Sequence, residues 1–164
     1  MNEQVALGID IGGTNTVYGL ITKDGNVIHH ESIPTNGSLP IADLLNRLNS
    51  KVNEALSSYP EIKKIIGVGI GAPNGNHFTG MIQNPPNLSW GNVDVNTLFS
   101  KTFECEVDLT NDANAAALGE KHFGIAKDME DFVVITLGTG LGSGIFCGGR
   151  PVSYTHLRAH ETSE

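Results

Sequence analysis

The sequence contains little that would place the chain in a membrane or in an oxidising compartment. No apolar run approaches the roughly 20 residues that a bilayer-spanning helix needs, and residues 1–4 lack the basic start of a signal peptide. Cysteine occurs only at Cys105 and Cys147, which predicts two reduced, buried thiols instead of a disulfide framework or a metal site. We therefore expect a cytoplasmic protein with no membrane partner.

Basic residues are also scarce. The chain has 10 Lys and Arg against 18 Asp and Glu, for a net charge of -8. Such a charge disfavours nucleic acids and anionic membranes, which both present phosphates. It does not exclude a nucleotide ligand, because backbone dipoles and Mg²⁺ act locally. A hydrophobic content of 39% in 164 residues fits one globular domain, or one domain and part of another.

The first half of the sequence predicts strands followed by a helix. Apolar segments at residues 5–11, 16–21 and 27–33 are separated by short turns, which favours an antiparallel meander. Apolar residues then recur at helical spacing from Ile41 to Leu56, with Ser38 as the expected N-cap.

The next stretch predicts one buried strand and a long loop. Residues 65–71 form a continuous apolar run, typical of a parallel strand buried on both faces. Residues 72–92 are rich in Gly, Pro and Asn and predict a long irregular loop, a kind of segment that is often functional.

The second half alternates helices and strands. We expect a helix over residues 95–103, a strand over 106–109, an alanine-rich helix over 111–123, and two strands over 131–137 and 144–147. The order βββαβαβα predicts an α/β domain with a mixed sheet at residues 1–123. Residues 124–150 would begin a second, incomplete domain with its first hairpin.

The composition changes at the C-terminal end. Residues 151–164 show no clear amphipathic pattern and resemble a vector-derived tail, which favours a non-native segment. His156 and His160 are spaced to share one helix face, as a metal site would require. We favour the non-native tail over that metal site.

A glycine-containing turn follows the first predicted strand, in the segment Asp10-Ile11-Gly12-Gly13-Thr14-Asn15. Two glycines let backbone N–H groups approach a phosphate closely, and Thr14 and Asn15 add polar side chains. Asp10 is placed to hold Mg²⁺ through water. An ordinary hairpin turn is the competing interpretation.

A second glycine-rich segment joins the last two predicted strands, from Leu137 to Gly144. It is not a Walker A loop, since no Gly-Lys-Ser/Thr follows, and it is not a dinucleotide fingerprint, since a strand follows instead of a helix. Two such hairpins could hold one nucleoside triphosphate from opposite sides.

The third motif, Asn111-Asp112-Ala113-Asn114, lies where a strand meets a helix. A carboxylate in this place can act as a general base towards an attacking hydroxyl. Asn111 or Asp112 can equally serve as the helix cap, and the two roles are compatible.

Together the three motifs resemble those of the ROK family, which comprises bacterial sugar kinases and related repressors in the actin-like ATPase superfamily. The segments Asp10-x-Gly12-Gly13-Thr14, Asn111-Asp112-Ala113-Asn114 and Leu137-Gly138-Thr139-Gly140-x-Gly142-x-Gly144 occur in the family's order and spacing. Gly69-Ile70-Gly71-Ala72-Pro73 and Pro86-Asn87-Leu88-x-Trp90 are most similar to the glucokinase branch. The fold implied is a ribonuclease H-like, actin-like ATPase domain.

The resemblance implies a role for each motif residue. Asp112 would be the catalytic base. The sugar would be bound by Asn111, Asn87, Asn74 and Gly75. The phosphates of ATP would be bound by Asp10, Gly12, Gly13, Thr14, Asn15, Gly138, Thr139, Gly140 and Gly142, and Asp10 would also hold Mg²⁺ through water. Asn74 stands where the family commonly has Gly, and asparagine tolerates the left-handed conformation of such a turn.

The resemblance also implies that the chain is truncated at its C-terminus. The family's Glu-x-Gly-His segment and its cysteine-rich zinc site are expected after Gly149, and neither is in the sequence. Any structural zinc would belong to that missing part. We therefore expect an inactive fragment with unpaired strand edges and exposed apolar surface after residue 131.

The implied reaction is phosphorylation of glucose to glucose 6-phosphate by ATP with Mg²⁺, in a parent protein that forms a homodimer. Kinases for N-acetylglucosamine, mannose or fructose are close alternatives. A sugar-responsive transcription regulator of the same family is a further alternative. Only four residues precede Val5, where the regulators carry a DNA-binding domain, so we expect no nucleic-acid partner.

Overall fold

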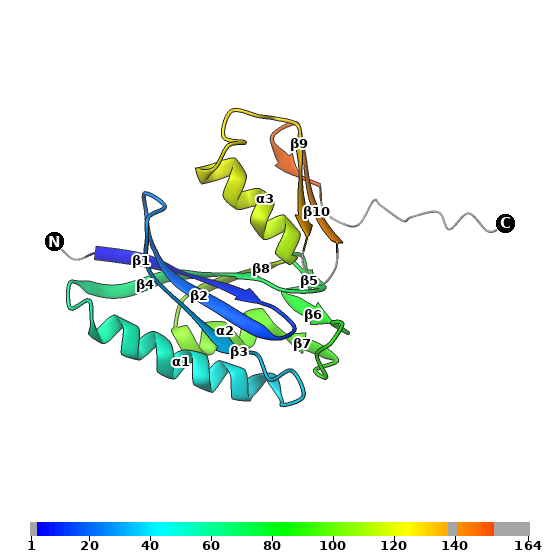
Figure 1. The fold of residues 1–164 in the computed structure, drawn as a ribbon. Coiled ribbons are helices and arrows are strands. Elements are labelled where there is room, and N and C mark those ends of the chain that lie inside the picture. Colours follow the sequence, from blue (N-terminus) through cyan, green and yellow to red (C-terminus); the bar gives the residue numbers. More distant parts are fainter. Residues whose placement is uncertain (1–2, 138–140, 153–164) are drawn as a thin grey trace.

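The computed structural model describes residues 3–137 and 141–152, and a five-stranded mixed sheet is its largest element (Figure 1). The strand order is β3-β2-β1-β4-β8. The strands are β1 Glu3–Ile11, β2 Asn15–Thr22, β3 Val27–Pro34, β4 Ile62–Gly71 and β8 Glu106–Thr110. The first three pair antiparallel, and β4 and β8 continue the sheet in parallel with β1. The predicted meander and mixed sheet are confirmed.

Two helices cover one face of this sheet, α1 Ile41–Ser57 and α2 Val95–Phe103 (Figure 1). The apolar stripe of α1 is buried against the strands, as its spacing predicted. The expected Ser38 cap is wrong. Pro40 is the N-cap residue, without a side-chain bond, because Ser38 lies in a turn closed by Leu39 N–H and Asn36 O at 2.8 Å. In α2 the Asp94 carboxylate accepts the N–H of Thr97 at 2.9 Å.

Strand β4 is less buried than its apolar run predicted. The side chain of Ile66 is 48% exposed, although Val68 and Ile70 are buried. On the face opposite α1 and α2, helix α3 (Asp112–Phe123) meets β4 at Gly71 and then rises away from the sheet (Figure 1). Ile66 lies beyond that contact, so the expectation of burial on both faces was wrong for its part of the strand.

Residues 72–92 are more ordered than the predicted loop. They contain β5 Gly75–Asn76 and β6 Met81–Gln83, which pair antiparallel and continue to β7 Asn92–Asp94. Side-chain amides close the turns: Asn74 Nδ2 donates to the carbonyls of Gln83 and Asn84, each at 3.1 Å. Asn74 has φ 55°, so it takes the left-handed conformation expected where the family commonly has Gly.

A second sheet packs on the far side of α3, with the order β11-β10-β9 (Figure 1). Its strands are β9 Phe132–Leu137, β10 Leu141–Cys147 and β11 Arg150–Pro151. One face rests on α3, and the other exposes Val133, Ile135, Leu137 and Leu141, with Leu137 83% exposed. The expected exposed apolar surface is therefore present.

The start of the proposed tail takes part in this second sheet. Pro151 belongs to β11, and Val152 N–H donates to Ile145 O at 2.8 Å. Residues 153–164, which include His156 and His160, lie outside the described residues. The proposed domain and tail boundaries stay predictions.

The two cysteines differ in exposure. Both are free; Cys105 is half-buried against the core and Cys147 is exposed. The prediction of two buried thiols was wrong for Cys147, because it ends β10 at the solvent side of the small sheet. Of the helices in residues 3–137 and 141–152, none combines the length and apolar character needed to cross a membrane.

Candidate functional site

The carboxyl ends of three neighbouring strands bring the first and third motifs together. Asp10 of β1 pairs in register with Gly71 of β4, and Gly71 pairs with Thr110 of β8. Asn111 and Asp112 follow directly at the start of α3. Ligands of open α/β sheets bind at the carboxyl ends of the strands. The sheet order therefore makes this edge the candidate active site.

Gly71 lies next to both acidic residues, Asp10 and Asp112. A Cβ at this position would lie 3.5 Å from Asp112 Cα and 3.8 Å from Asp10 Oδ1. Burial raises the pKa of Asp10 above its usual value, and the negative charge of Asp112 raises it further. The charge of Asp112 thus acts on Asp10 and disfavours ionisation of the Asp10 carboxyl.

This pair of carboxylates fits the chemistry of Mg²⁺. The cation prefers oxygen ligands, keeps several waters and needs only one or two carboxylates. A cation beside Asp10 would relieve the repulsion that raises its pKa. Over the described part of the chain no three His, Cys, Asp or Glu side chains gather into a metal-binding group. Within the described residues, Asp10 with Asp112 near it has the oxygen ligands that suit a hydrated magnesium ion.

Replacing Asp10 by Asn is expected to raise the thermal stability at neutral pH. The folded state raises the pKa of Asp10, so ionising this carboxyl costs folding free energy, and the cost is present once the pH exceeds the folded pKa. The gain in Tm should shrink as the pH falls towards the ordinary value of 3.8, where Asp10 is protonated in the wild type. Thermal unfolding followed by circular dichroism from pH 3 to pH 8 tests this.

Asp24→Asn, in the exposed turn between β2 and β3, is the matched control and should not show this pH-dependent gain. An Asp10→Asn variant that is less stable than wild type at pH 7 would contradict the expectation. Extra stability on removal of a charge is typical of residues kept for function.

The β1–β2 loop, residues 12–14, is closed by its own backbone. Gly12 N–H donates to Asn15 O at 2.9 Å. A Cβ on Gly12 would lie 2.7 Å from that carbonyl oxygen, so the tight turn needs glycine here. The side chains of Thr14 and Asn15 are exposed beside it. The loop is thus a tight turn with exposed polar side chains, and its role in binding ATP stays a prediction.

A cavity of about 620 Å³ opens beside α3. Three of the four predicted sugar-binding residues line it: Asn74, Gly75 and Asn111. The fourth, Asn87, is not among the lining residues and lies instead beside Gly13, where an added Cβ would be 3.4 Å from Asn87 Cβ. Asn87 therefore neighbours the β1–β2 loop.

Sequence reasoning missed most of the cavity wall. The other lining residues are Asn76, His77, Phe78, Gln83, Thr110, Asn114, Leu118 and Pro151. Asn114 had a detectable signal, since it lies three residues after Asn111 and so on the same helix face. The residues of the β5–β6 turn gave no such signal in the sequence. In a segment that is expected to be irregular, no periodic pattern indicates which side chains line a cavity.

The structure settles how α3 is capped. Asn111 is the N-cap, and its Oδ1 accepts the N–H of Ala113 at 3.0 Å. Asn111 also lines the cavity, so capping and ligand contact are compatible. Asp112 is the first helical residue, and its Oδ1 accepts the same N–H at 2.8 Å. The carboxylate is thereby oriented by the start of the helix.

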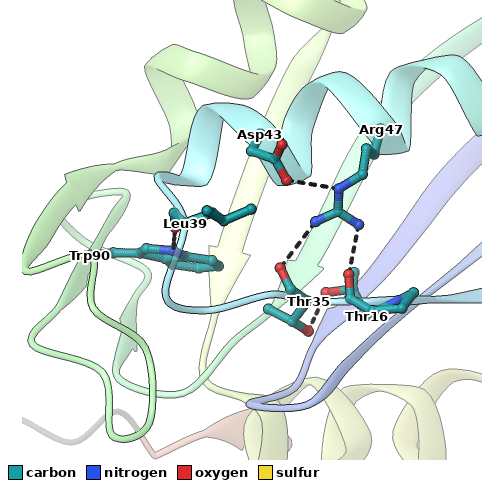
Figure 2. A network of polar contacts seen from close by, with 7 residues as sticks. Thr16, Thr35, Leu39, Asp43, Arg47 and Trp90 are labelled. Atoms are coloured by element: carbon teal, nitrogen blue, oxygen red, sulfur yellow. Dashed lines mark hydrogen bonds and ion pairs between the residues drawn. The ribbon is translucent and has the colours of Figure 1, made fainter.

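Trp90 packs instead of lining the cavity. Its Nε1 donates to Leu39 O at 2.8 Å, which ties the segment before β7 to the turn before α1 (Figure 2). The lining residues of the cavity do not include it. Trp90 therefore stabilises this contact between two loops and is not part of the cavity wall.

Only part of the second glycine-rich segment is described. Gly138, Thr139 and Gly140 lie outside the described residues. Gly142 is in β10, where an added Cβ would be 3.2 Å from Ala113 Cβ and would overlap Thr136 Oγ1. Close packing on α3 is thus a reason for glycine here, and the predicted contact of Gly142 with ATP stays a prediction.

Comparison with known proteins agrees with this geometry. The sequence profile of the ROK family matches residues 6–156. A glucokinase from Halalkalibacterium halodurans is 32% identical over 151 residues, which cover 91% of this chain and 46% of the relative. The chain spans about half the length of the curated relatives it matches.

Two solved structures show the same fold. A ROK family glucokinase from Streptomyces griseus, in complex with glucose and AMPPNP, is 29% identical with a TM-score of 0.75, over 90% of this chain and 46% of that chain. A ROK family transcriptional regulator, described as a homolog of the E. coli MLC protein, is 25% identical with a TM-score of 0.77, over 92% and 38%. Kinases and regulators therefore share this architecture.

Proposed function

Because the chain belongs to the ROK family, we propose that the whole protein transfers the γ-phosphoryl group of ATP to a hexose, with glucose as the foremost candidate. The observation that carries this proposal is the position of Asp112. It directly follows Asn111, which comes after the last residue of β8 and lines the 620 Å³ cavity, and its charge contributes to the raised pKa of Asp10. A cytoplasmic location, where ATP is available, belongs to the same proposal.

The residues of this chain would divide the work as follows. Amide groups such as those of Asn74, Asn111 and Asn114 can hydrogen-bond the hydroxyls of a sugar in the cavity. Asp112 then takes the proton of the acceptor hydroxyl as its oxygen attacks the γ-phosphorus. The bond from that phosphorus to the bridging oxygen breaks, and ADP leaves.

The β1–β2 loop would present backbone N–H groups to the phosphates. Mg²⁺, when bound near Asp10, would supply neutralising charge for those phosphates. Most of the catalytic effect would come from positioning and electrostatics, since phosphoryl transfer asks little covalent chemistry of the protein.

A coupled assay of ADP release by the whole protein, with glucose, N-acetylglucosamine, mannose and fructose in turn, tests the proposal. Turnover with glucose and little with the others is the expected result. The 164-residue chain alone should give negligible turnover, because it covers less than half of the kinase relatives' length. Absence of turnover with every hexose would contradict the kinase proposal. Strong activity of the 164-residue chain alone would contradict the expectation that it is an inactive fragment.

A sugar-responsive regulator is the second candidate, and the TM-score of 0.77 to a ROK family transcriptional regulator favours keeping it. A regulator that responds to a sugar would also bind one, so sugar binding alone does not separate the two candidates. Sequence-specific DNA binding by the whole protein, released by a sugar and without ADP production, would support the regulator. The homodimer expected of the whole protein is tested separately by light scattering.

A further inference from the structure

Two threonines stand out among the buried residues of the described chain. Thr16 and Thr35 are the polar side chains buried there, with 0% and 1% of their surface exposed. Buried hydroxyls are costly unless they are hydrogen-bonded. Thr16 lies in β2, just after the β1–β2 loop, and Thr35 comes directly after β3, the strand that pairs with β2.

The two hydroxyls form a relay that ends on the loop. Thr35 Oγ1 donates to Gly12 O at 2.7 Å. Thr35 and Thr16 are joined by a hydroxyl–hydroxyl bond of 2.9 Å (Figure 2). Since the single hydroxyl proton of Thr35 goes to Gly12, Thr16 must be the donor in that second bond. Each donor therefore strengthens the next bond towards Gly12.

Thr35 also holds the far end of the loop. Its backbone N–H donates to Thr14 O at 2.8 Å. One residue thus binds the carbonyls of both Gly12 and Thr14. In a planar trans peptide the C=O and the next N–H point in opposite directions. Turning these two carbonyls towards Thr35 therefore directs the N–H groups of Gly13 and Asn15 away from it.

Arg47 of α1 fixes the position of Thr35. Its Nη1 donates to Pro34 O at 2.7 Å and its Nη2 to Thr35 O at 3.1 Å, while Nε pairs with Asp43 at 2.8 Å (Figure 2). A guanidinium can hold two neighbouring carbonyls and a carboxylate at once because its donors are fixed in one plane. The helix is thereby connected through Thr35 to the β1–β2 loop.

We propose that Thr35 and Arg47 are positioning residues for the β1–β2 loop, which hold its N–H groups in the arrangement that receives the phosphates of ATP. The inference rests on the proposed function for the identity of the ligand. The hydrogen bonds by which Thr35 holds the β1–β2 loop lie within this chain, so their effect on the loop can be measured without any ligand.

Amide hydrogen exchange of the 164-residue chain, followed by NMR, tests the holding directly. Thr35→Val keeps the shape of the side chain and removes the hydroxyl, so the amides of Gly12 and Thr35 should exchange about tenfold faster, as expected for one lost hydrogen bond. Thr35→Ser restores the hydroxyl and should return exchange to near the wild-type rate. The core amides of Ile70 and Leu109 should be unchanged in both variants.

Arg47→Lys provides a second variant in case Thr35→Val does not fold. Lysine keeps the positive charge but lacks the planar guanidinium group with its several N–H donors. Hydrogen exchange of the Thr35 amide should therefore again be several times faster than in the wild type. Lys51→Met is the matched control, because Lys51 lies one turn further along α1 and pairs with Glu31 and Glu54 at the surface. Loop exchange that is unchanged in both Thr35→Val and Arg47→Lys would overturn the proposal.

The link to ATP is tested by steady-state kinetics of the whole protein. Thr35→Val should raise the KM for ATP about tenfold and leave the KM for the hexose unchanged. A merely structural role would lower the amount of active enzyme and leave both KM values unchanged, which would overturn the phosphate-positioning part. A wild-type protein with no kinase activity would contradict the proposed function, while the exchange result would still decide whether Thr35 holds the loop.

Discussion

Replacing Asp112 by Asn is expected to lower the kcat of hexose phosphorylation by the whole protein by about 10²–10⁴-fold, the range of a lost general base. The amide keeps the size of the side chain and its bond to Ala113 N–H, so the start of α3 should stay in place. It cannot accept the proton of the sugar hydroxyl. The measurement is kcat with saturating glucose and ATP in the coupled assay of ADP release.

Asp108→Asn is the matched control for this substitution. Asp108 is exposed on the same strand, β8, and pairs in register with Gly69 away from the strand ends. Its kcat should stay near the wild-type value. A wild-type kcat in Asp112→Asn would contradict the role of Asp112 as the base.

The Asp112→Asn variant can also be tested in the 164-residue chain, through the pKa of Asp10. The charge of Asp112 contributes to the raised pKa of Asp10, so Asp112→Asn should lower the pKa of Asp10. It should not restore the ordinary value, since burial is the larger cause. Carboxyl carbon shifts followed by NMR as a function of pH would show the change and confirm that the two groups share one site.

Replacing Gly144 by Ala is expected to destabilise the packing of the second sheet on α3 by about 1–3 kcal/mol, the usual cost of overpacking. An added Cβ would overlap the backbone carbonyl of Ala113 and the Cβ of Ala117. Backbone at this contact cannot move without shifting the first turn of α3. Thermal unfolding should show a Tm several degrees lower, and the amides of β9 and β10 should exchange faster.

Gly119→Ala is the contrasting substitution on the same helix. A Cβ at this exposed position meets nothing within 4 Å, and alanine is the better helix former by about 0.8–1.0 kcal/mol. Its Tm should rise. If Gly144→Ala is as stable as wild type, the close contact between β10 and α3 is not as described. In the whole protein Gly144→Ala should also reduce activity, because Asp112 precedes Ala113 at the disturbed turn.

Local patterns predicted most of the elements of this fold. The extent of α2 was predicted to the residue from its sequence pattern. In the structure the Asp94 carboxylate caps its start, and Glu104 ends it in the left-handed conformation. The meander followed from three apolar runs joined by short turns. The strands hidden in residues 72–92 were missed, because they are two or three residues long and are held by amide side chains instead of by an apolar pattern.

The candidate site also has features that the sequence predicted and features that it did not. Asp10 and Asp112 were identified because a carboxylate at the end of a strand, beside glycines or at a helix start, is a local feature. That both lie next to Gly71 was not predictable from spacing, since about 100 residues separate them in the sequence and the strand order brings them together. Thr35 and Arg47 carried no signal at all, because a single threonine after a strand is ordinary until its hydrogen-bond partner is known.

The sequence by itself determined the family, the order of the elements and the residue types available for phosphoryl transfer, because each depends on motifs of a few consecutive residues. Only the tertiary structure decided which of those residues meet. The parallel pairing of β1, β4 and β8 sets Asp10 beside Asp112, and the buried relay from Thr16 through Thr35 to Gly12 orients the β1–β2 loop. These contacts join distant segments through hydrogen bonds and close packing, whose geometry exists only once the chain has folded.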